Sequence, residues 1–195
     1  MEGKGLKKRI PIGVDDFKKV RDGDYCFVDK SELISDILRE GAEVYLFTRP
    51  RRFGKSLNLS MLDAFFNLKY PKDNKWFDGL KVSDCKECQE YKNAYPIIYF
   101  DFKDLDAKDC NRFLGKLRQK LSDLYSGYGY LPDSDELDRK DVSNYNDILD
   151  CTADDSVVEY SLKNLSKMLY KHHGTKVVVL IDEYDNPINN SFGKS

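Results

Sequence analysis

Short apolar runs alternate with amphipathic stretches along this chain of 195 residues. Continuous apolar runs favour strands that are buried on both faces of a parallel sheet, and they occur at residues 43–48, 96–102 and 177–181. Elsewhere, apolar residues recur at helical spacing, which predicts helices at residues 30–40, 56–67, 107–125 and 154–171. The alternation predicts an α/β fold with a mostly parallel sheet that helices cover on both faces.

Turn-forming residues separate these elements. We expect Ser31 to cap the first helix, Gly41 to end it, and Gly174 to end the last one. Residues 69–95 and 126–141 are rich in proline, glycine and aspartate, so they are interpreted as loops.

Composition excludes several classes of protein. With 41% hydrophobic and 13% aromatic residues the chain is not of the disordered type, and its formal net charge of −2 gives no electrostatic case for general nucleic-acid binding. No apolar run approaches the roughly 18 residues that span a bilayer. The basic cluster near the N-terminus has no apolar stretch behind it, so it is not a secretory signal. We therefore expect a cytoplasmic protein without a membrane partner.

The five cysteines are odd in number and irregular in spacing. Only Cys85 and Cys88 have a metal-like spacing, and a structural zinc site usually needs a second pair. Without a secretory signal, we expect reduced, free thiols.

Gly54, Lys55 and Ser56 are the residue types of a phosphate-binding loop. Such a loop needs a glycine-bearing turn, backbone amides, a lysine for the β- and γ-phosphates, and a hydroxyl for Mg²⁺. The three residues lie between a predicted strand and a predicted helix, whose N-terminus favours an anion. Arg49 departs from the general pattern G-x-x-x-x-G-K-[S/T] at its first glycine. Residues 192–195 repeat the letters FGKS without a strand directly before them, and are interpreted as chance.

Asp182 and Glu183 follow the most apolar strand that the pattern predicts. An apolar strand that ends in Asp-Glu is typical of a Walker B site, at the carboxyl edge of a parallel sheet. The first carboxylate can bind Mg²⁺, and the second can polarise a water for attack on a γ-phosphate. The alternative is an ordinary acidic strand exit, but the order of the two segments along the chain favours a joint site.

Other candidates keep two interpretations. Arg51 and Arg52 could neutralise phosphate charge, or be solvated loop residues. His172 and His173 are expected to complement a helix C-terminus rather than bind a metal. A flexible loop and a base-stacking loop are the alternatives for Tyr125, Tyr128 and Tyr130.

Together these segments resemble the predicted AAA-ATPase-like family of bacterial P-loop NTPases. Residues 48–62 read TRPRRFGKSLNLSML, which is similar to the loop of that family and includes its arginine at position 49. Residues 10–30 resemble the N-terminal signature, and residues 181–187 resemble the Walker B segment. The resemblance places nine residues in the nucleotide-binding loop, namely Arg49, Pro50, Arg51, Arg52, Phe53, Gly54, Lys55, Ser56 and Leu57.

The resemblance also implies a fold and a longer parent protein. It implies a P-loop three-layer α/β/α sandwich, with residues 1–40 packing on an ATPase core at residues 41–195. Members often continue into a C-terminal domain that resembles PD-(D/E)XK nucleases. The chain is therefore interpreted as an N-terminal fragment whose sheet is incomplete after Walker B, with no visible candidate for a sensor residue or arginine finger.

The leading hypothesis is a module that binds Mg-ATP and hydrolyses ATP. Lys55 would bind the β- and γ-phosphates, Ser56 and Asp182 would serve Mg²⁺, and Glu183 would position water. By resemblance, residues 12–17 would supply part of the base pocket. The alternative is a non-hydrolysing regulatory or interaction module that acts beside a protein partner or a second copy. A link to nucleic-acid processing rests only on the family's usual C-terminal domain.

Overall fold

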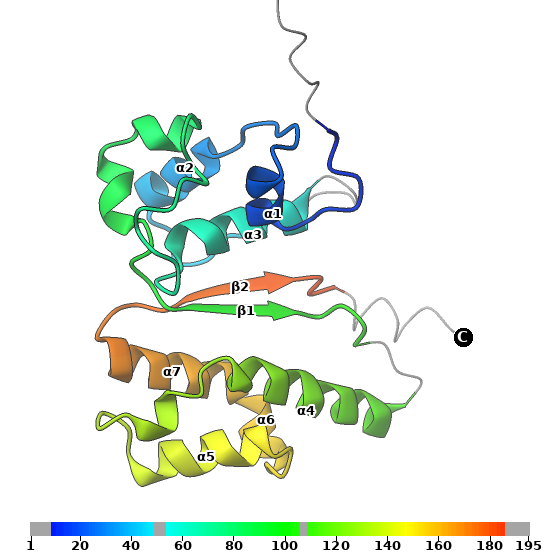
Figure 1. Cartoon of the computed structure of the whole chain (residues 1–195). Coiled ribbons are helices and arrows are strands. Elements are labelled where there is room, and N and C mark those ends of the chain that lie inside the picture. The colour runs from blue at the N-terminus through cyan, green and yellow to red at the C-terminus, as the bar shows by residue number, and fades with distance from the viewer. Residues whose placement is uncertain (1–8, 49–53, 106–108, 186–195) are drawn as a thin grey trace, which may run out of the picture. The chain divides into compact units, whose positions relative to one another are not determined.

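The computed structural model describes residues 9–48, 54–105 and 109–185, and it divides into two compact units, residues 1–95 and 96–195. The described residues form an α/β structure with seven α-helices, three short 3₁₀ helices and two strands (Figure 1). No helix in this part of the chain is long and apolar enough to cross a bilayer.

The first unit is built around three α-helices. These are α1 (Phe17–Asp22), α2 (Glu32–Glu40) and α3 (Lys55–Phe66), followed by the 3₁₀ helices η1 (Lys81–Asp84) and η2 (Glu87–Tyr91). Its core contains the rings of Phe17, Phe65 and Phe77, with Phe77 centred 4.9 Å from Phe17 and 5.1 Å from Phe65. The core therefore joins α1 to the C-terminal half of α3.

A polar network also joins α1 to α3. The buried Asp63 accepts hydrogen bonds from Asn67 Nδ2 at 2.7 Å and from the Tyr70 hydroxyl at 3.0 Å. Lys18 of α1 lies 3.8 Å from the same carboxylate and also donates to the Tyr70 hydroxyl. Burial, followed by the charge of Asp63, raises the pKa of Tyr70, so the phenol stays protonated as a donor.

The second unit contains a parallel two-stranded sheet and four helices. Strand β1 (Ile97–Asp101) is followed by α4 (Cys110–Ser126), the 3₁₀ helix η3 (Leu131–Asp133), α5 (Arg139–Leu149), α6 (Asp155–Glu159), α7 (Ser161–His173) and strand β2 (Val178–Asp182). In register, Ile97 pairs with Val178 and Asp101 pairs with Asp182. Within this unit α4 and α7 lie on one face of the sheet (Figure 1).

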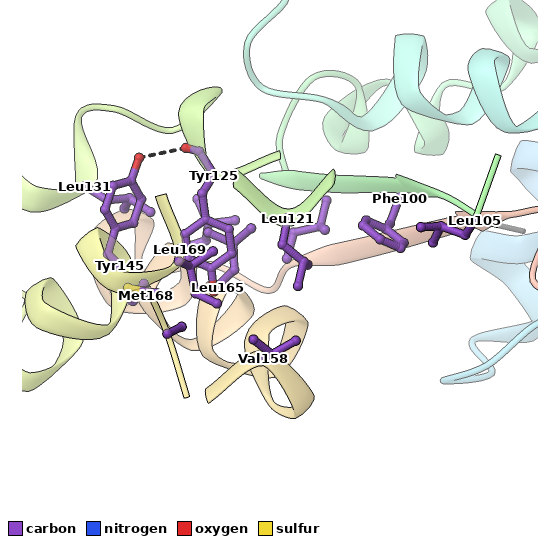
Figure 2. Close-up of a cluster of buried hydrophobic side chains, with 13 residues drawn as sticks. Phe100, Leu105, Leu121, Tyr125, Leu131, Tyr145, Val158, Leu165, Met168 and Leu169 are labelled. Atoms are coloured by element: carbon purple, nitrogen blue, oxygen red, sulfur yellow. Dashed lines mark hydrogen bonds between the residues drawn. The ribbon is translucent and has the colours of Figure 1, made fainter. Parts of the chain in front are cut away.

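Side chains from β1, α4, α5 and α7 form the core of the second unit, shown in Figure 2. Two buried tyrosines place their hydroxyls within this apolar cluster without leaving them unpaired. Tyr145 donates to the backbone carbonyl of Tyr125 at 2.7 Å, and Tyr125 donates to the carbonyl of Ser161 at 2.7 Å. These bonds join three helices, because α5 is tied to α4 and α4 to α7.

The predicted strand at residues 43–48 is wrong, because these residues form no strand in the described structure. Val44 and Leu46 are 83% and 67% exposed. The Tyr45 hydroxyl instead donates to the carbonyl of Ile37 at 2.9 Å, which ties the segment to the end of α2. A strand needs a neighbour for its backbone hydrogen bonds, and no described residue pairs with this segment.

Helix boundaries show further differences. The helix predicted at residues 154–171 is divided at Tyr160 into α6 and α7. Ser31 stands before α2 without capping it, since its hydroxyl accepts from the Val82 amide at 3.1 Å. Gly41 and Gly174 follow α2 and α7 as expected.

The prediction that all five thiols are free is also wrong. Cys85 and Cys88 form a disulfide, because the turn between η1 and η2 brings their Cα atoms to 5.3 Å. Cys26, Cys110 and Cys151 are free.

Candidate functional site

The N-terminus of α3 has the features of an anion site. Gly54 precedes the helix with φ of +76°, a left-handed conformation that glycine adopts without steric cost. Among the described residues no side chain caps the helix, and its first turn contains no acidic residue. Lys55 and Ser56 begin the helix and are half-buried, as is Leu57. Free first-turn amides and the helix dipole together favour a phosphate at this position.

Arg49, Pro50, Arg51, Arg52 and Phe53 lie outside the described residues. Their assignment to nucleotide binding, and both interpretations of Arg51 and Arg52, stay predictions.

The first residue of α1 is joined to α3 one turn beyond Ser56. Phe17 donates its backbone N–H to the Ser60 hydroxyl at 2.9 Å, and its ring is fully buried. Asp16 caps α1 by accepting from the amides of Lys18 and Lys19, at 2.9 and 3.3 Å. Ile12, at the start of the expected base-pocket segment, is 88% exposed.

Asp182 is the last residue of β2, as the strand pattern predicts for a Walker B carboxylate. Its side chain is buried, with the residue only 6% exposed. Oδ1 accepts from the Glu183 amide at 3.0 Å, and no cationic side chain of the described residues pairs with this carboxylate. A carboxylate in this position has the oxygen chemistry to bind a divalent cation.

Glu183 leaves the strand in an unusual conformation. Its φ of +52° lies in the left-handed region, which non-glycine residues rarely adopt. The side chain is half-buried and forms no hydrogen bond or ion pair with the described residues. Backbone strain of this kind concentrates at functional sites, so it supports a role for Glu183.

Asp101 is a candidate that the sequence interpretation missed. It ends β1 and is the register partner of Asp182, so the two carboxylates occupy the last pair of the sheet. The signal was present in the sequence, because the apolar run at residues 96–102 contains an aspartate near its end, as the Walker B strand does. Acidic residues at the carboxyl ends of adjacent parallel strands are expected to lie together.

The tandem histidines lie in the last turn of α7, as predicted. His172 Nδ1 lies 2.8 Å from the Ser134 hydroxyl, and His173 Nε2 lies 2.9 Å from the Tyr130 hydroxyl. Burial, followed by the charge of His172, lowers the pKa of His173 and so favours its neutral form. No group of three or more histidine, cysteine, aspartate or glutamate side chains in the described ranges is arranged to hold a metal.

The sequence matches the family described as "Predicted AAA-ATPase" over residues 11–195. The chain belongs to this AAA-ATPase-like family. The family name suggests nucleotide binding.

One relative in the family comparison is a protein of Azotobacter chroococcum mcd 1, described as "Uncharacterized protein in vnfD 5'region". It is 30% identical over 183 residues, which are 93% of this chain and 30% of that protein. The chain thus spans about 30% of the length of this relative. No solved structure matches the chain with statistical significance.

Proposed function

We propose that this chain is a P-loop module that binds Mg-ATP and hydrolyses it, within a three-layer α/β/α sandwich of the P-loop type. The observation that carries the proposal is the N-terminus of α3, where Gly54 has φ of +76° and no side chain in the described part of the chain caps the first turn. Lys55 and Ser56 stand in that first turn with the chemistry to bind phosphate oxygens and a metal.

The residues available suit Mg²⁺ better than a softer metal. The proposed ligands are the Ser56 hydroxyl and the Asp182 carboxylate, and Mg²⁺ is commonly bound by one or two carboxylates together with substrate phosphates and water. Asp182 is buried and has no cationic partner among the described side chains, which supports a cation there. Bound Mg²⁺ would neutralise charge that develops on the transferred phosphoryl group.

Each of the proposed site residues has its own role in the reaction. Lys55 would bind the β- and γ-phosphates, and the amides after Gly54 would bind phosphate oxygens. Glu183 would orient a water molecule for in-line attack on the γ-phosphate. Of the remaining loop, Arg51 and Arg52 are proposed to contact phosphate oxygens.

The experiment is a thermal melt with and without Mg-ATP, on the wild-type chain and Lys55→Ala. Ligand at 100 times its dissociation constant should add about 2.7 kcal/mol to the free energy of unfolding. The midpoint should then rise by roughly 5–10 °C for a chain of this size. Lys72→Ala, an exposed lysine of the same unit, is the matched control and should keep the whole shift.

The outcomes separate binding from hydrolysis. If Mg-ATP raises the melting temperature of the wild type and of Lys72→Ala but not of Lys55→Ala, the phosphate site is supported. If Mg-ATP does not raise the melting temperature of the wild type, the proposal is overturned. Phosphate release is then measured on the wild type and on Glu183→Gln. Phosphate release by the wild type but not by Glu183→Gln supports hydrolysis. If the wild type binds ATP but releases no phosphate, the regulatory or interaction module is favoured instead.

A further inference from the structure

The last residue pair of the sheet consists of two aspartates. Asp101 and Asp182 are Cα partners in the parallel register of β1 and β2. Partners in adjacent parallel strands project their side chains to the same face, and neighbouring strands lie about 4.8 Å apart. The two carboxylates therefore stand side by side at the carboxyl edge of the sheet.

The backbone around this pair is firmly held. Phe102 donates its N–H to the carbonyl of Asp182 at 3.0 Å, which continues the register one step beyond the strands. Lys120 of α4 donates to the backbone carbonyl of Asp101 at 2.6 Å, and Lys116 donates to the carbonyl of Asp104 at 2.9 Å. These bonds hold the turn after β1 through its main chain.

The side chains of the pair lack a cation within the described part of the chain. Asp101 Oδ1 accepts from the Lys103 amide at 2.7 Å, and Asp182 Oδ1 accepts from the Glu183 amide at 3.0 Å. Each bond satisfies one carboxylate oxygen and leaves the negative charge uncompensated. Asp182 is more than nine-tenths buried, Asp101 is half-buried, and neither carboxylate has a cationic partner among the described side chains. A divalent cation would compensate both negative charges, and carboxylate oxygens are among the ligands that Mg²⁺ prefers.

We infer that Asp101 is a second acidic residue for the divalent cation of the nucleotide site, alongside Asp182. Asp101 would supply negative charge beside the cation and could accept from one of its bound waters, because Mg²⁺ bound with a nucleotide usually keeps several waters. The inference rests on the proposed function, because the cation arrives with ATP.

The test measures how strongly Mn²⁺ tightens binding of the fluorescent nucleotide mant-ATP. The dissociation constant is measured in EDTA and in Mn²⁺ for the wild-type chain, Asp101→Asn, Asp182→Asn and Asp104→Asn. Asparagine keeps an oxygen that can accept from the Lys103 amide, so Asp101→Asn removes the charge with little change in shape. Asp104 is the matched control, because it lies exposed in the same turn with φ of +64°, which asparagine tolerates.

In EDTA, Asp104→Asn should bind mant-ATP as the wild type does, and Asp101→Asn and Asp182→Asn should bind it no more weakly, because each removes a negative charge beside the phosphates. The tightening by Mn²⁺ should fall about tenfold in Asp101→Asn and at least as much in Asp182→Asn, and should be unchanged in Asp104→Asn. Melts in EDTA should show Asp101→Asn at least as stable as the wild type, because asparagine keeps an acceptor for the Lys103 amide and no described ion pair is lost.

The failures of the two proposals can be told apart. If Asp101→Asn keeps the wild-type tightening while Asp182→Asn loses it, Asp101 does not serve the cation and the nucleotide site stands. A lower melting temperature of Asp101→Asn in EDTA assigns Asp101 a structural role and also overturns the inference. If the wild type binds no mant-ATP in Mn²⁺, the proposed function fails and the inference fails with it.

Discussion

Replacing Glu183 by asparagine should stabilise the protein while it abolishes ATP hydrolysis. Glu183 holds φ of +52°, and the left-handed region costs a non-glycine residue about 1–2 kcal/mol. Asparagine adopts this conformation more readily, so Glu183→Asn should recover roughly half of that cost, or about 0.5–1 kcal/mol. The Glu183 side chain has no hydrogen bond or ion pair with the described residues, so little is lost in return. For a chain of this size the melting temperature should rise by about 1–4 °C.

Glu183→Gln is the control, because glutamine has the shape of glutamate and keeps the strain. Thermal unfolding followed by circular dichroism, together with phosphate release, compares the two variants with the wild type. Both variants should stop hydrolysis, but only Glu183→Asn should melt at a higher temperature. If the asparagine variant melts no higher than the glutamine variant, the positive φ at position 183 does not lower the stability of the protein, and the reasoning is refuted.

Two further predictions concern a glycine and a helix cap. Gly54→Ala should lower the free energy of unfolding by about 1–2 kcal/mol in a chemical denaturation series, because alanine is strained at φ of +76°. The cost is one of backbone strain alone, since an added Cβ would meet no atom within 4 Å. Gly115→Ala in α4 is the control, because its Cβ would also meet no atom, and it should not destabilise the protein. Asp138 accepts from the Asp141 amide and from Lys171, which lowers its pKa to about 2. Its ionised form favours folding at pH values above about 4, and this contribution is lost as the pH falls to about 2. The difference in melting temperature between the wild type and Asp138→Asn should therefore shrink over that range, whereas the exposed Asp135→Asn should show no such trend.

Elements with strong local patterns could be predicted from the sequence. The helix at residues 56–67 is α3 (Lys55–Phe66), and the run at residues 177–181 is β2 (Val178–Asp182). Residues 43–48 have the same apolar character but form no strand, because a strand depends on a neighbour that the local sequence does not specify.

Helix α5 was missed for a different reason. Few of its residues are apolar, since the buried side of Arg139–Leu149 relies on Tyr145 and Ile148 among polar neighbours. A capping signal was available, because Asp138 accepts from the amides of Lys140 and Asp141.

The candidate site was predictable in its residue types but not in its pairings. Lys55 and Ser56 do begin a helix after a left-handed glycine, and Asp182 does end a strand. Asp101 escaped notice because its importance depends on strand register, which joins residues far apart in the chain. The conformation of Glu183 was equally hidden, since no residue type at that position signals a positive φ.

The two-stranded sheet has a practical consequence for work on this chain. Among the described residues β1 and β2 pair only with each other, so each has a row of backbone donors and acceptors without a ladder partner. Val179 and Ile181 of β2 are about 40% exposed. Open strand edges with apolar side chains are templates for further strands, and natural proteins usually protect them with charge, bulges or covering elements. Concentrated samples of this chain are therefore prone to edge-to-edge aggregation, and dilute samples are the better starting point for crystallisation trials and ligand titrations.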